Sequence, residues 1–387
     1  MVHNKWTTSV RTVHRSVLLR DLDGMSDGEA ENGEAANARD LFAWLSREVR
    51  ELVSHVPRVH SPSPIGFLRD HVSSNRPAVI TGAFDDWPAM ERWNLDYLAD
   101  AMGDAKVSVN VTPDGRGDAL LSTDGWTVSG LGDDEMKPGE VFVQPEEREM
   151  TLREFATMLA TPTEDPDANA HASRRPAVPY VSRQCGSLLE EFPSLVDDCA
   201  DEIPFASQAL GKRPDAVNLW IGDERSHTTF HRDHYENMYC VVRGVKVFHL
   251  LPPCDGRVLG YADAPAARFE QKLVAGENRF VLALERPRRT VAWASATPAS
   301  LHARARRTNP RDAVVPIVVE VKAGEALYLP AMWYHHVEQR RDESGQPAVA
   351  VNYWYDMSFD DRYAYARFAQ EAHARFGGEN PSECDGL

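Results

Sequence analysis

Residues 226–253 read SHTTFHRDHYENMYCVVRGVKVFHLLPP. The second half of this stretch holds two apolar runs, rich in valine and aromatic residues, that meet at Arg243–Gly244, a dipeptide suited to a tight turn. We therefore expect strands over 238–244 and 245–253, joined as a hairpin. The first half is polar, and its histidine and carboxylate side chains lie close together at the entry to these strands.

Other strand-like segments lie on both sides of this stretch. KVSVNVTPDG (106–115) alternates between apolar and polar residues and ends in a Pro-Asp-Gly turn, which predicts a half-buried antiparallel strand. Shorter apolar runs of strand length occur within 76–90, 179–184, 217–222, 316–330 and 347–356.

Helical patterns flank these strands. Apolar residues recur at helical spacing over 38–53 and 359–376, and a Ser-Pro helix start occurs within 61–72. Strands and helices do not alternate along the chain. We therefore expect a mainly β protein with flanking helices, built on a small antiparallel barrel or sandwich.

Polar composition marks the tails and several connections. We expect loops or surface insertions at 127–148, 161–177 and 255–313. The N-terminal region includes DLDGMSDGEAENGEAANARD (21–40), which is too acidic and too poor in apolar residues to form a core. The sequence therefore predicts a disordered acidic tail over 1–36, one folded domain over 37–376 and a short tail over 377–387.

Overall composition narrows the class of protein. The chain has 387 residues and a formal net charge of −17, which argues against direct nucleic-acid binding. No apolar run reaches the roughly 18 residues that a membrane-spanning helix needs. The five cysteines are scattered and form no CxxC pair, as is typical of a reducing compartment. Since no secretory signal pattern is seen, we expect a cytoplasmic protein that also reaches the nucleus.

The polar half of the opening stretch contains a candidate metal site. His231 and Asp233 are two residues apart, so on a strand they would face the same side. Much later, GEALYLPAMWYHH (324–336) ends in His335 and His336, beyond an apolar strand. Either histidine would complete a set of two histidines and one carboxylate. That set leaves coordination positions open and is diagnostic of non-haem Fe(II) oxygenases.

Lys246 lies within the apolar run VKVFHL (245–250). A lysine in such surroundings is rarely buried without a partner. An oxygenase that binds a dicarboxylate co-substrate needs a cation for the carboxylate far from the metal, and Lys246 is a candidate for it. The alternative is a lysine on the solvent face of an edge strand.

These stretches, together with AGEALYLPAMWYHHV (323–337) and AVNYWYDM (350–357), resemble the jumonji-C (JmjC) oxygenases. The resemblance covers roughly residues 40–376. It implies a double-stranded β-helix, that is, a jelly-roll or cupin-like core, with Fe(II) as the metal and 2-oxoglutarate and O₂ as co-substrates. It is greatest to a lysyl hydroxylase of the family. That likeness implies hydroxylation at C3 of a lysine in developmentally regulated, translation-factor-type GTPases.

The resemblance also assigns site residues one by one. The family's iron ligands fall on His231, Asp233 and His335, because the spacing in its LPxxWxH pattern selects His335 over His336. Its 2-oxoglutarate contacts fall on Tyr180, Thr228, Asn237 and Lys246. Two further positions beside the cofactor fall on Asn352 and Trp354.

Three other functions share parts of this pattern. A histone lysine demethylase would use the same iron chemistry on an N-methyl group, but the chain lacks the Cys/His zinc clusters of chromatin-reading fingers. A histone-tail peptidase, an activity attributed to one family member, would need a general base and no 2-oxoglutarate. A non-catalytic cupin-like scaffold would have no reason to keep the metal ligands.

Several residues near the motifs have less definite roles. We expect His234 to face away from the metal and His227 and His249 to be packing or solvent histidines. Their neighbours Tyr235 and Glu236 are placed at the mouth of the cleft. The pair Asp223–Glu224, just before the motif, is a candidate receiver for a cationic lysine.

The expected partner is a protein that presents a lysine. A second copy of the chain is also expected, through the closing helix at 359–376, whose aromatic residues are Tyr363, Tyr365, Phe368 and Phe376. The alternative is that this stripe of aromatic residues packs on the barrel. Neither a membrane nor a nucleic acid is expected as a partner.

Overall fold

The structure is a computed structural model, and it describes residues 41–132, 135–161, 172–274 and 276–376. The tails expected at 1–36 and 377–387, and most of the segment 161–177, lie outside these residues. Within the described residues, no helix is both long enough and apolar enough to cross a membrane.

Strands make up most of the described chain. The first ten are β1 (Arg58–His60), β2 (Ala78–Thr81), β3 (Lys106–Thr112), β4 (Arg116–Gly117), β5 (Ala119–Ser122), β6 (Val128–Ser129), β7 (Glu140–Gln144), β8 (Glu146–Thr151), β9 (Val178–Tyr180) and β10 (Ala216–Gly222). The later ones are β11 (His227–His231), β12 (Tyr235–Arg243), β13 (Val245–Leu251), β14 (Tyr261–Val274), β15 (Glu277–Leu284), β16 (Thr290–Ala294), β17 (Ile317–Lys322), β18 (Glu325–Leu329), β19 (Tyr334–Arg340) and β20 (Ala348–Asp356).

Helices surround the strands. Residues 41–52 are helical, and the further helices are α2 (Pro64–Phe67), α3 (Pro88–Arg92), α4 (Leu95–Met102), α5 (Leu152–Ala160), α6 (Ser187–Glu191), α7 (Pro204–Leu210), α8 (Pro298–Ala305) and α9 (Asp361–Phe376). Short helical turns are η1 (Leu68–Val72), η2 (Ala172–Arg174), η3 (Pro193–Asp198) and η4 (Pro253–Leu259). The expected Ser-Pro start is seen at α2, where the Ser63 hydroxyl accepts a hydrogen bond from the Gly66 amide.

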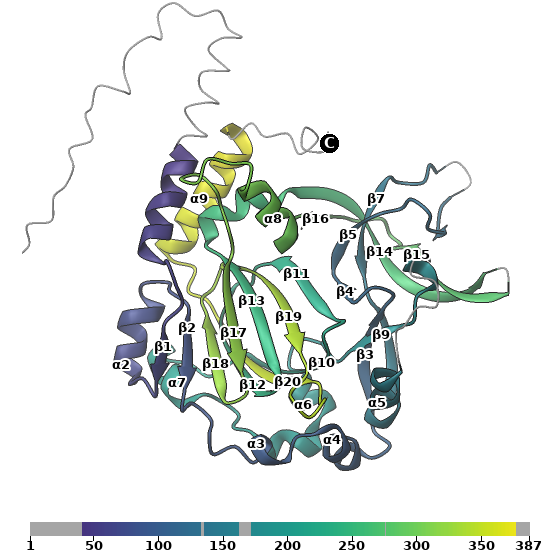
Figure 1. Ribbon diagram of the computed structural model, residues 1–387, viewed down its shortest axis with the longest axis horizontal. Helices are drawn as coiled ribbons and strands as arrows, with labels where there is room; N and C mark the ends of the chain where they lie inside the picture. The colour runs from purple at the N-terminus through teal and green to yellow at the C-terminus, as the bar shows by residue number, and fades with distance from the viewer. Residues whose placement is uncertain (1–40, 133–134, 162–171, 275, 377–387) are drawn as a thin grey trace, which may run out of the picture.

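Two sheets form the centre of the molecule (Figure 1). One has the strand order β1-β2-β18-β12-β20-β10, and the other has the order β17-β13-β19-β11-β4. Their neighbouring strands are antiparallel, apart from the short pairs β1–β2 and β4–β11 at the sheet edges. Trp220, Tyr239 and Leu327 of the first sheet pack in one hydrophobic cluster with Phe248 and Val337 of the second. This two-sheet packing confirms the expected jelly-roll core.

The turn at Arg243–Gly244 is not the expected hairpin. Strand β12 pairs with β18 and β20, whereas β13 pairs with β17 and β19, so the two consecutive strands belong to different sheets. The turn therefore carries the chain from one sheet to the other. Gly244 has a φ of 70°, and a Cβ there would lie 2.6 Å from the carbonyl oxygen of Arg340, so a side chain is excluded.

The prediction of loops at 127–148 and 255–313 is wrong for much of both segments. They contribute β6, β7, β14 and β15 to a third sheet with the order β5-β7-β14-β15-β6, and β16 pairs with β14. Phe269 and Phe280 of this sheet are buried in the largest hydrophobic cluster. A fourth sheet, β8-β3-β9, contains the alternating strand predicted at 106–115.

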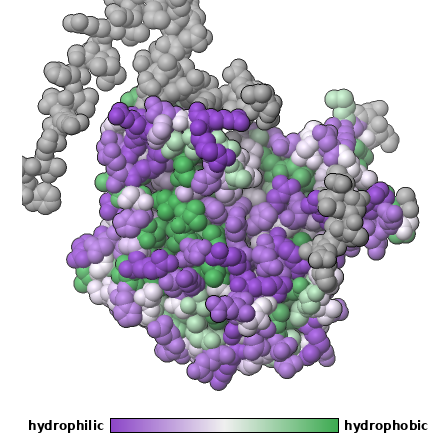
Figure 2. All heavy atoms as spheres, in the orientation of Figure 1, coloured by the Kyte–Doolittle hydropathy of each residue, from purple (hydrophilic) through white to green (hydrophobic). Residues whose placement is uncertain are grey.

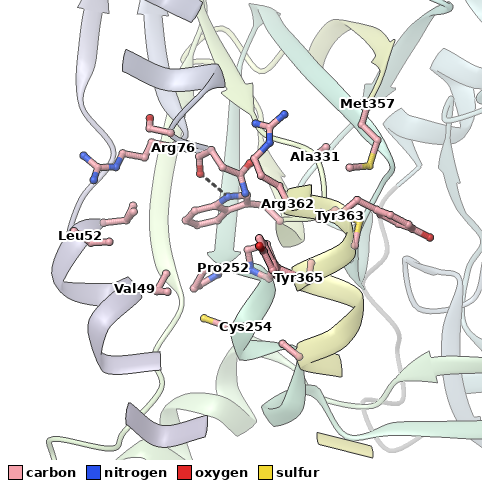
Figure 3. Close-up of a pocket in the computed structure, with 18 of the residues that line it drawn as sticks. Val49, Leu52, Arg76, Pro252, Cys254, Ala331, Met357, Arg362, Tyr363 and Tyr365 are labelled. Atoms are coloured by element: carbon pink, nitrogen blue, oxygen red, sulfur yellow. Dashed lines mark hydrogen bonds between the residues drawn. The ribbon is translucent and has the colours of Figure 1, made fainter. Parts of the chain in front are cut away.

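The helical residues 41–52 and α9 lie side by side at one corner of the molecule (Figure 1). The rings of Phe42 and His373 meet edge to face there, with centroids 5.2 Å apart. A groove of about 310 Å³ lies next to these helices, and its lining includes Val49, Met357 and Tyr363 (Figure 3).

The outward faces of the molecule are unevenly apolar. Figure 2 shows one hydrophobic area on the face towards the viewer, over β13 and β17, where Val318 is 50 % exposed.

No residue of α9 is buried, and Tyr365 and Phe368 are 71 % and 72 % exposed. These two rings therefore project outwards, whereas Tyr363 is partly buried against the cluster of Ala331, Met332 and Met357, so the stripe packs on the barrel only in part.

Candidate metal centre

Strand pairing brings the predicted metal ligands together. His231 is the last residue of β11, and it lies directly opposite His335 of β19 in the antiparallel register. Asp233 lies in the turn between β11 and β12 rather than on a strand, and its carbonyl oxygen accepts a hydrogen bond of 2.9 Å from the amide of Met332. This bond ties the turn after β11 to the turn before β19.

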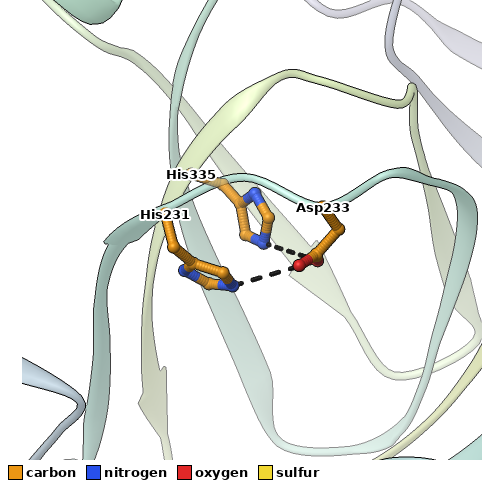
Figure 4. A group of neighbouring side chains, drawn as sticks. All are labelled: His231, Asp233 and His335. Carbon is orange, nitrogen blue, oxygen red and sulfur yellow. Dashed lines mark ion pairs between the residues drawn. The ribbon is translucent and has the colours of Figure 1, made fainter. Parts of the chain in front are cut away.

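The donor atoms of His231, Asp233 and His335 all lie within 4.8 Å of one another (Figure 4). Oδ2 of Asp233 is 3.9 Å from Nε2 of His231 and 3.6 Å from Nε2 of His335. These separations suit neighbouring ligands of one ion bound at about 2.0–2.2 Å. No other group of three such side chains in the described part of the chain meets the same limit.

Each histidine is oriented by its second ring nitrogen. Nδ1 of His231 donates to the carbonyl oxygen of Thr229 at 2.8 Å, and Nδ1 of His335 donates to that of Trp333 at 3.1 Å. The Nε2 lone pairs are thereby directed towards Asp233, which is the arrangement of a metal ligand held by a second hydrogen bond. Burial, assisted by the neighbouring His231, lowers the pKa of His335 to about 4, so its imidazole is neutral at pH 7.

Lys246 is fully buried between the two central sheets. Its strand, β13, is an inner strand that pairs with both β17 and β19, so the alternative of a solvent-facing edge lysine is excluded. Nζ donates to the hydroxyl of Tyr180 at 3.2 Å and to the side-chain carbonyl of Gln339, and both partners are neutral. Burial lowers the pKa of Lys246 to about 7. A buried ammonium with neutral partners is well suited to bind an anion.

Tyr180 and Thr228 lie beside this lysine. Tyr180 ends β9, and its hydroxyl interacts with those of Thr228 and Tyr239, while burial raises its pKa. Thr228 is on β11, three residues before His231. The structure thus brings the ammonium of Lys246 together with the hydroxyl groups of Tyr180 and Thr228, and Thr228 lies on the strand that also carries His231.

Asn237 and Asn352 form a buried pair of amides. Nδ2 of Asn352 donates to Oδ1 of Asn237 at 3.1 Å, and Oδ1 of Asn352 accepts from the indole of Trp220 at 2.8 Å. This fixes which way the Asn237 amide points. Trp354 lies opposite Asn237 on β20, and its buried indole nitrogen has no hydrogen-bond partner.

The two residues expected at the mouth of the cleft, Tyr235 and Glu236, both make contacts within the fold. Glu236 is buried and accepts hydrogen bonds from the Tyr328 hydroxyl at 2.7 Å and the Ala331 amide at 3.2 Å. Tyr235 stacks on Trp354 with ring centroids 4.9 Å apart. Polar residues are usually assigned to the surface from sequence, and here tertiary neighbours give them buried partners.

Asp223 cannot receive a substrate lysine, contrary to the expectation from its position before the motif. Its side chain is fully buried, and Oδ2 is 2.7 Å from Arg225 and 2.6 Å from Arg341. Glu224 lies 3.4 Å from the same Arg341. Both carboxylates are therefore engaged by arginines within the chain.

The remaining histidines of the motifs face away from the metal ligands. The ring of His234 lies 6.2 Å from Phe359 and 6.1 Å from Tyr363, near α9. His336 is on the opposite side of β19 from His335, and its ring is 5.5 Å from that of His227. Neither His234 nor His336 is part of the group of donor atoms around Asp233.

Asp118 is a residue near the site that sequence reasoning missed. It follows β4, the strand that pairs with β11, and its carbonyl oxygen accepts a 2.5 Å hydrogen bond from the Thr229 hydroxyl. Its Oδ1 atom is buried and has no hydrogen-bond partner. Burial raises the pKa of Asp118, and the nearby His231 opposes that change. The sequence gives no signal that β4 pairs with β11, so the position could not be recognised.

Comparison with known proteins agrees with this geometry. The cupin-like domain family matches residues 64–361. The human bifunctional peptidase and (3S)-lysyl hydroxylase JMJD7 is 37 % identical over 304 residues, which are 79 % of this chain and 84 % of the relative. The lysine-specific demethylase JMJ32 of Arabidopsis thaliana is 37 % identical over 346 residues, 87 % of this chain and 92 % of the relative.

A third relative, the JmjC domain-containing protein E of Dictyostelium discoideum, is 31 % identical over 344 residues, 86 % of this chain and 93 % of the relative. The matches to the three relatives extend over most of both chains, and the family model covers the His231–Asp233–His335 group and the two central sheets apart from β1. The chain therefore belongs to the jumonji-C family of cupin-like oxygenases.

Proposed function

We propose that the protein is an Fe(II)- and 2-oxoglutarate-dependent protein hydroxylase that acts on a lysine side chain at C3. The observation that carries the proposal is the combination of the His231–Asp233–His335 group with the buried Lys246, whose hydrogen-bond partners Tyr180 and Gln339 are neutral. The first provides a metal site with open positions, and the second provides a cation for a dicarboxylate. A developmentally regulated GTPase is the proposed substrate protein.

The residues present fit the metal and the co-substrate. When bound, Fe(II) with 2-oxoglutarate and O₂ supplies the chemistry that inserts one oxygen atom into a C–H bond, with succinate and CO₂ as the other products. The chain holds the reactants in place. We assign the far carboxylate of 2-oxoglutarate to Lys246, Tyr180 and Thr228. Asn237, oriented by Asn352, is assigned as a further contact of the same molecule, with Trp354 beside it.

Lysine as the substrate class is supported by Asp118. Its carboxyl group interacts electrostatically with His231 and Arg289, and its buried Oδ1 has no hydrogen bond, which an ammonium group of a bound lysine would supply. The net charge of −17 further favours a basic substrate segment, because it raises the rate of encounter. We propose a cytoplasmic and nuclear location from the sequence alone.

Lysine demethylation is the second candidate, because the Arabidopsis relative, at 37 % identity, has the name of a lysine-specific demethylase. Both reactions bring a lysine to the same metal, and they differ in the carbon that is attacked. The peptidase in the name of the human relative is less well supported here. Cleavage of a peptide bond gives the anion-binding cluster around Lys246 no role.

Mass spectrometry separates these reactions. The full chain would be incubated with Fe(II), 2-oxoglutarate and a recombinant developmentally regulated GTPase, and the GTPase would be analysed as intact protein and as peptides. Hydroxylation adds one oxygen atom to a single lysine, and this change depends on 2-oxoglutarate. Loss of methyl groups from a methylated substrate would support demethylation, and chain cleavage would support the peptidase.

Two controls complete the experiment. Asp233→Ala should abolish the oxygen addition, whereas His234→Ala, at the adjacent position but facing α9, should retain it. If 2-oxoglutarate is consumed but no mass change is found on the GTPase, the oxygenase is retained and this substrate is wrong.

A further inference from the structure

Gln339 is a buried residue beside Lys246 that the sequence motifs did not single out. It lies on β19, four residues after His335, and in the antiparallel register it stands directly opposite Lys246 of β13. Side chains that are directly opposite on neighbouring strands project on the same side of the sheet. The side-chain carbonyl of Gln339 accepts a hydrogen bond from the ammonium of Lys246. The cation assigned to the co-substrate is therefore held by a glutamine amide.

Ser226 determines which way this amide points. Nε2 of Gln339 donates to Oγ of Ser226 at 2.6 Å and lies 3.2 Å from the carbonyl oxygen of the same residue. The Ser226 hydroxyl donates in turn to the carbonyl oxygen of Asp223 at 3.2 Å, so its lone pairs are left for the amide. If the amide were reversed, its NH₂ group would face the ammonium of Lys246, and two donors would meet. Oε1 must therefore face the lysine.

Close packing at Gly222 restricts the same network. A Cβ at Gly222, the last residue of β10, would lie 2.5 Å from Nε2 of Gln339 and 2.7 Å from Oγ of Ser226. It would also lie 2.6 Å from a ring carbon of Tyr180. The backbone of β10 thus approaches the amide as closely as a strand without a side chain permits. This leaves Gln339 little freedom to adopt another rotamer.

The ammonium of Lys246 keeps one N–H group for a ligand. Among the residues that the structure describes, Nζ has two hydrogen-bond acceptors, Oε1 of Gln339 and the hydroxyl of Tyr180, the latter at 3.2 Å. An ammonium has three N–H groups. The rings of Tyr180 and Tyr239 have their centroids 5.2 Å and 5.8 Å from Nζ, and their π faces favour a positive charge there. The lysine is thus held in place with one donor unused.

The surroundings of the lysine also leave its charge uncompensated. The backbone of Asp223 belongs to the hydrogen-bond network, but its carboxylate is paired with Arg225 and Arg341 at 2.7 Å and 2.6 Å. Burial alone lowers the pKa of Lys246, and no charged side chain of the described residues contributes to that change. A carboxylate among the neighbours of the ammonium would form an ion pair with it and oppose the entry of a second anion. A neutral acceptor does not.

We propose that Gln339 is a positioning residue for the co-substrate pocket. Its Oε1 holds the ammonium of Lys246 in place, and its neutrality leaves the charge of that ammonium for the far carboxylate of a dicarboxylate. The inference rests on the proposed function, since it takes 2-oxoglutarate as that dicarboxylate. Gln339 acts through Lys246 and is assigned no contact with 2-oxoglutarate itself.

Substitutions at Gln339 test this inference by ligand binding. The affinity of the full chain for 2-oxoglutarate would be measured by calorimetry at pH 6.5, with Mn²⁺ in the metal site. Gln339→Glu hardly changes the size of the side chain but places a carboxylate against Lys246, so we expect binding to weaken by about 100-fold. Gln339→Met removes the acceptor without adding charge, and we expect a loss of about tenfold, because hydrogen bonds to charged groups are among the stronger ones.

A matched control carries the same charge change outside the pocket. Gln346 is half-buried in the loop after β19, where its Oε1 accepts a hydrogen bond of 3.0 Å from the Leu95 amide. Gln346→Glu keeps that acceptor and should bind 2-oxoglutarate with wild-type affinity. In every variant the affinity for Mn²⁺ alone, measured by electron paramagnetic resonance of the free ion, should equal that of the wild type, which shows that the metal centre is folded.

The Lys246→Met background distinguishes positioning from packing. If Gln339 acts through the lysine, Gln339→Met should weaken binding by less than about twofold in this background, since no ammonium is left to hold. A residue that only fills space would give the same loss of about tenfold with and without Lys246. If Gln339→Glu does not fold, Gln339→Met and this double-mutant comparison still decide.

The outcomes separate this inference from the proposed function. Wild-type affinity in Gln339→Met, or equal losses in the two backgrounds, would overturn the inference and leave the proposed function in place. A wild-type chain that binds Mn²⁺ but no 2-oxoglutarate at millimolar concentration would overturn both. No protein substrate is used, so the identity of the hydroxylated protein does not affect the result.

Discussion

Asp233 is the residue on which the proposed metal centre depends most. It is the single carboxylate within 4.8 Å of both His231 and His335 in that group, and its backbone is tied to the turn before β19. We predict that Asp233→Ala loses bound Fe(II) and lowers 2-oxoglutarate turnover to background. Turnover would be followed by succinate release, with metal content measured in parallel. Iron-dependent turnover at the wild-type rate in this variant would show that the ligands lie elsewhere.

Lys246 gives a prediction for pH. Its pKa is lowered to about 7 by burial, and a carboxylate bound beside it would raise that pKa. 2-Oxoglutarate therefore binds to the form of the protein in which Lys246 is protonated. The affinity for 2-oxoglutarate should be greatest below pH 7 and should fall by up to about tenfold per unit as the pH rises above 7. Binding would be measured by calorimetry between pH 6 and 9 with Mn²⁺ in place of iron.

The variant Lys246→Met removes this ionisation. We expect it to weaken 2-oxoglutarate binding by about 100-fold at pH 6.5, since it removes a buried ion pair, and to abolish the pH dependence. Lys106, at the exposed start of β3, provides the control Lys106→Met, which should behave as wild type. A full pH dependence in Lys246→Met would assign the anion site to another cation.

Asp118 is predicted to select a charged substrate. Asp118→Asn keeps the shape of the side chain but removes its charge, so we expect KM for a lysine peptide to rise about tenfold or more, with 2-oxoglutarate binding unchanged. A peptide with norleucine in place of lysine should bind equally weakly to both forms. Equal KM values for the lysine peptide would mean that Asp118 is a packing residue.

Among the structural elements, the turn between β12 and β13 is tightly constrained by its geometry. Gly244→Ala places a Cβ 2.6 Å from the Arg340 carbonyl oxygen and 2.8 Å from Cα of Ala348, at a φ of 70°. We predict a loss of about 3 kcal/mol or more of unfolding free energy. Gly345→Ala, at a φ of 81° but with no atom within 4 Å of the added Cβ, should cost about 1 kcal/mol. Urea unfolding of both variants tests the difference; equal losses would show that φ alone matters.

The elements that the sequence predicted are those with a clear local pattern. Val107, Val109 and Val111 alternate and are buried on β3, and Ser63 caps α2 as its position suggested. Strand β14 was missed because YADAPAARFEQKLV mixes alanine, charge and a proline, so its strand conformation depends on pairing with β7, β15 and β16. Strand β19 was missed because its polar residues His335, His336 and Gln339 are buried only by neighbours from distant parts of the chain.

The site was predictable in part for a similar reason. His231, Asp233, His335 and Lys246 stand in motifs whose spacing and surroundings are unusual enough to be noticed. Asp118, in contrast, becomes a candidate only when β4 is placed beside β11, and Asp223 is excluded only when Arg341 is seen to reach it. These contacts join segments that are distant in the sequence, so no local sequence pattern indicates them.

At the scale of the whole molecule, α9 presents an exposed aromatic surface that no other described residue covers. Tyr365, Phe368 and Phe376 of α9 are 71 %, 72 % and 57 % exposed, so we propose that this helix joins two copies of the chain. Phe368→Glu combined with Tyr365→Glu should shift the protein to a monomer in sedimentation velocity at micromolar concentration. Leu273→Glu, a 72 % exposed residue on β14, is the control. A wild-type protein that is monomeric at all concentrations would remove the proposal.

The crossing at Gly244 has a consequence for how the protein is made. Every strand that pairs with β12 or β13 lies within 317–356, far later in the chain. On the ribosome, both strands therefore emerge with unpaired edges and apolar faces, and they remain so until the last quarter of the chain has left the exit tunnel. A nascent chain that stalls before β17 would expose two unfinished sheets at once, and such open strand edges favour aggregation.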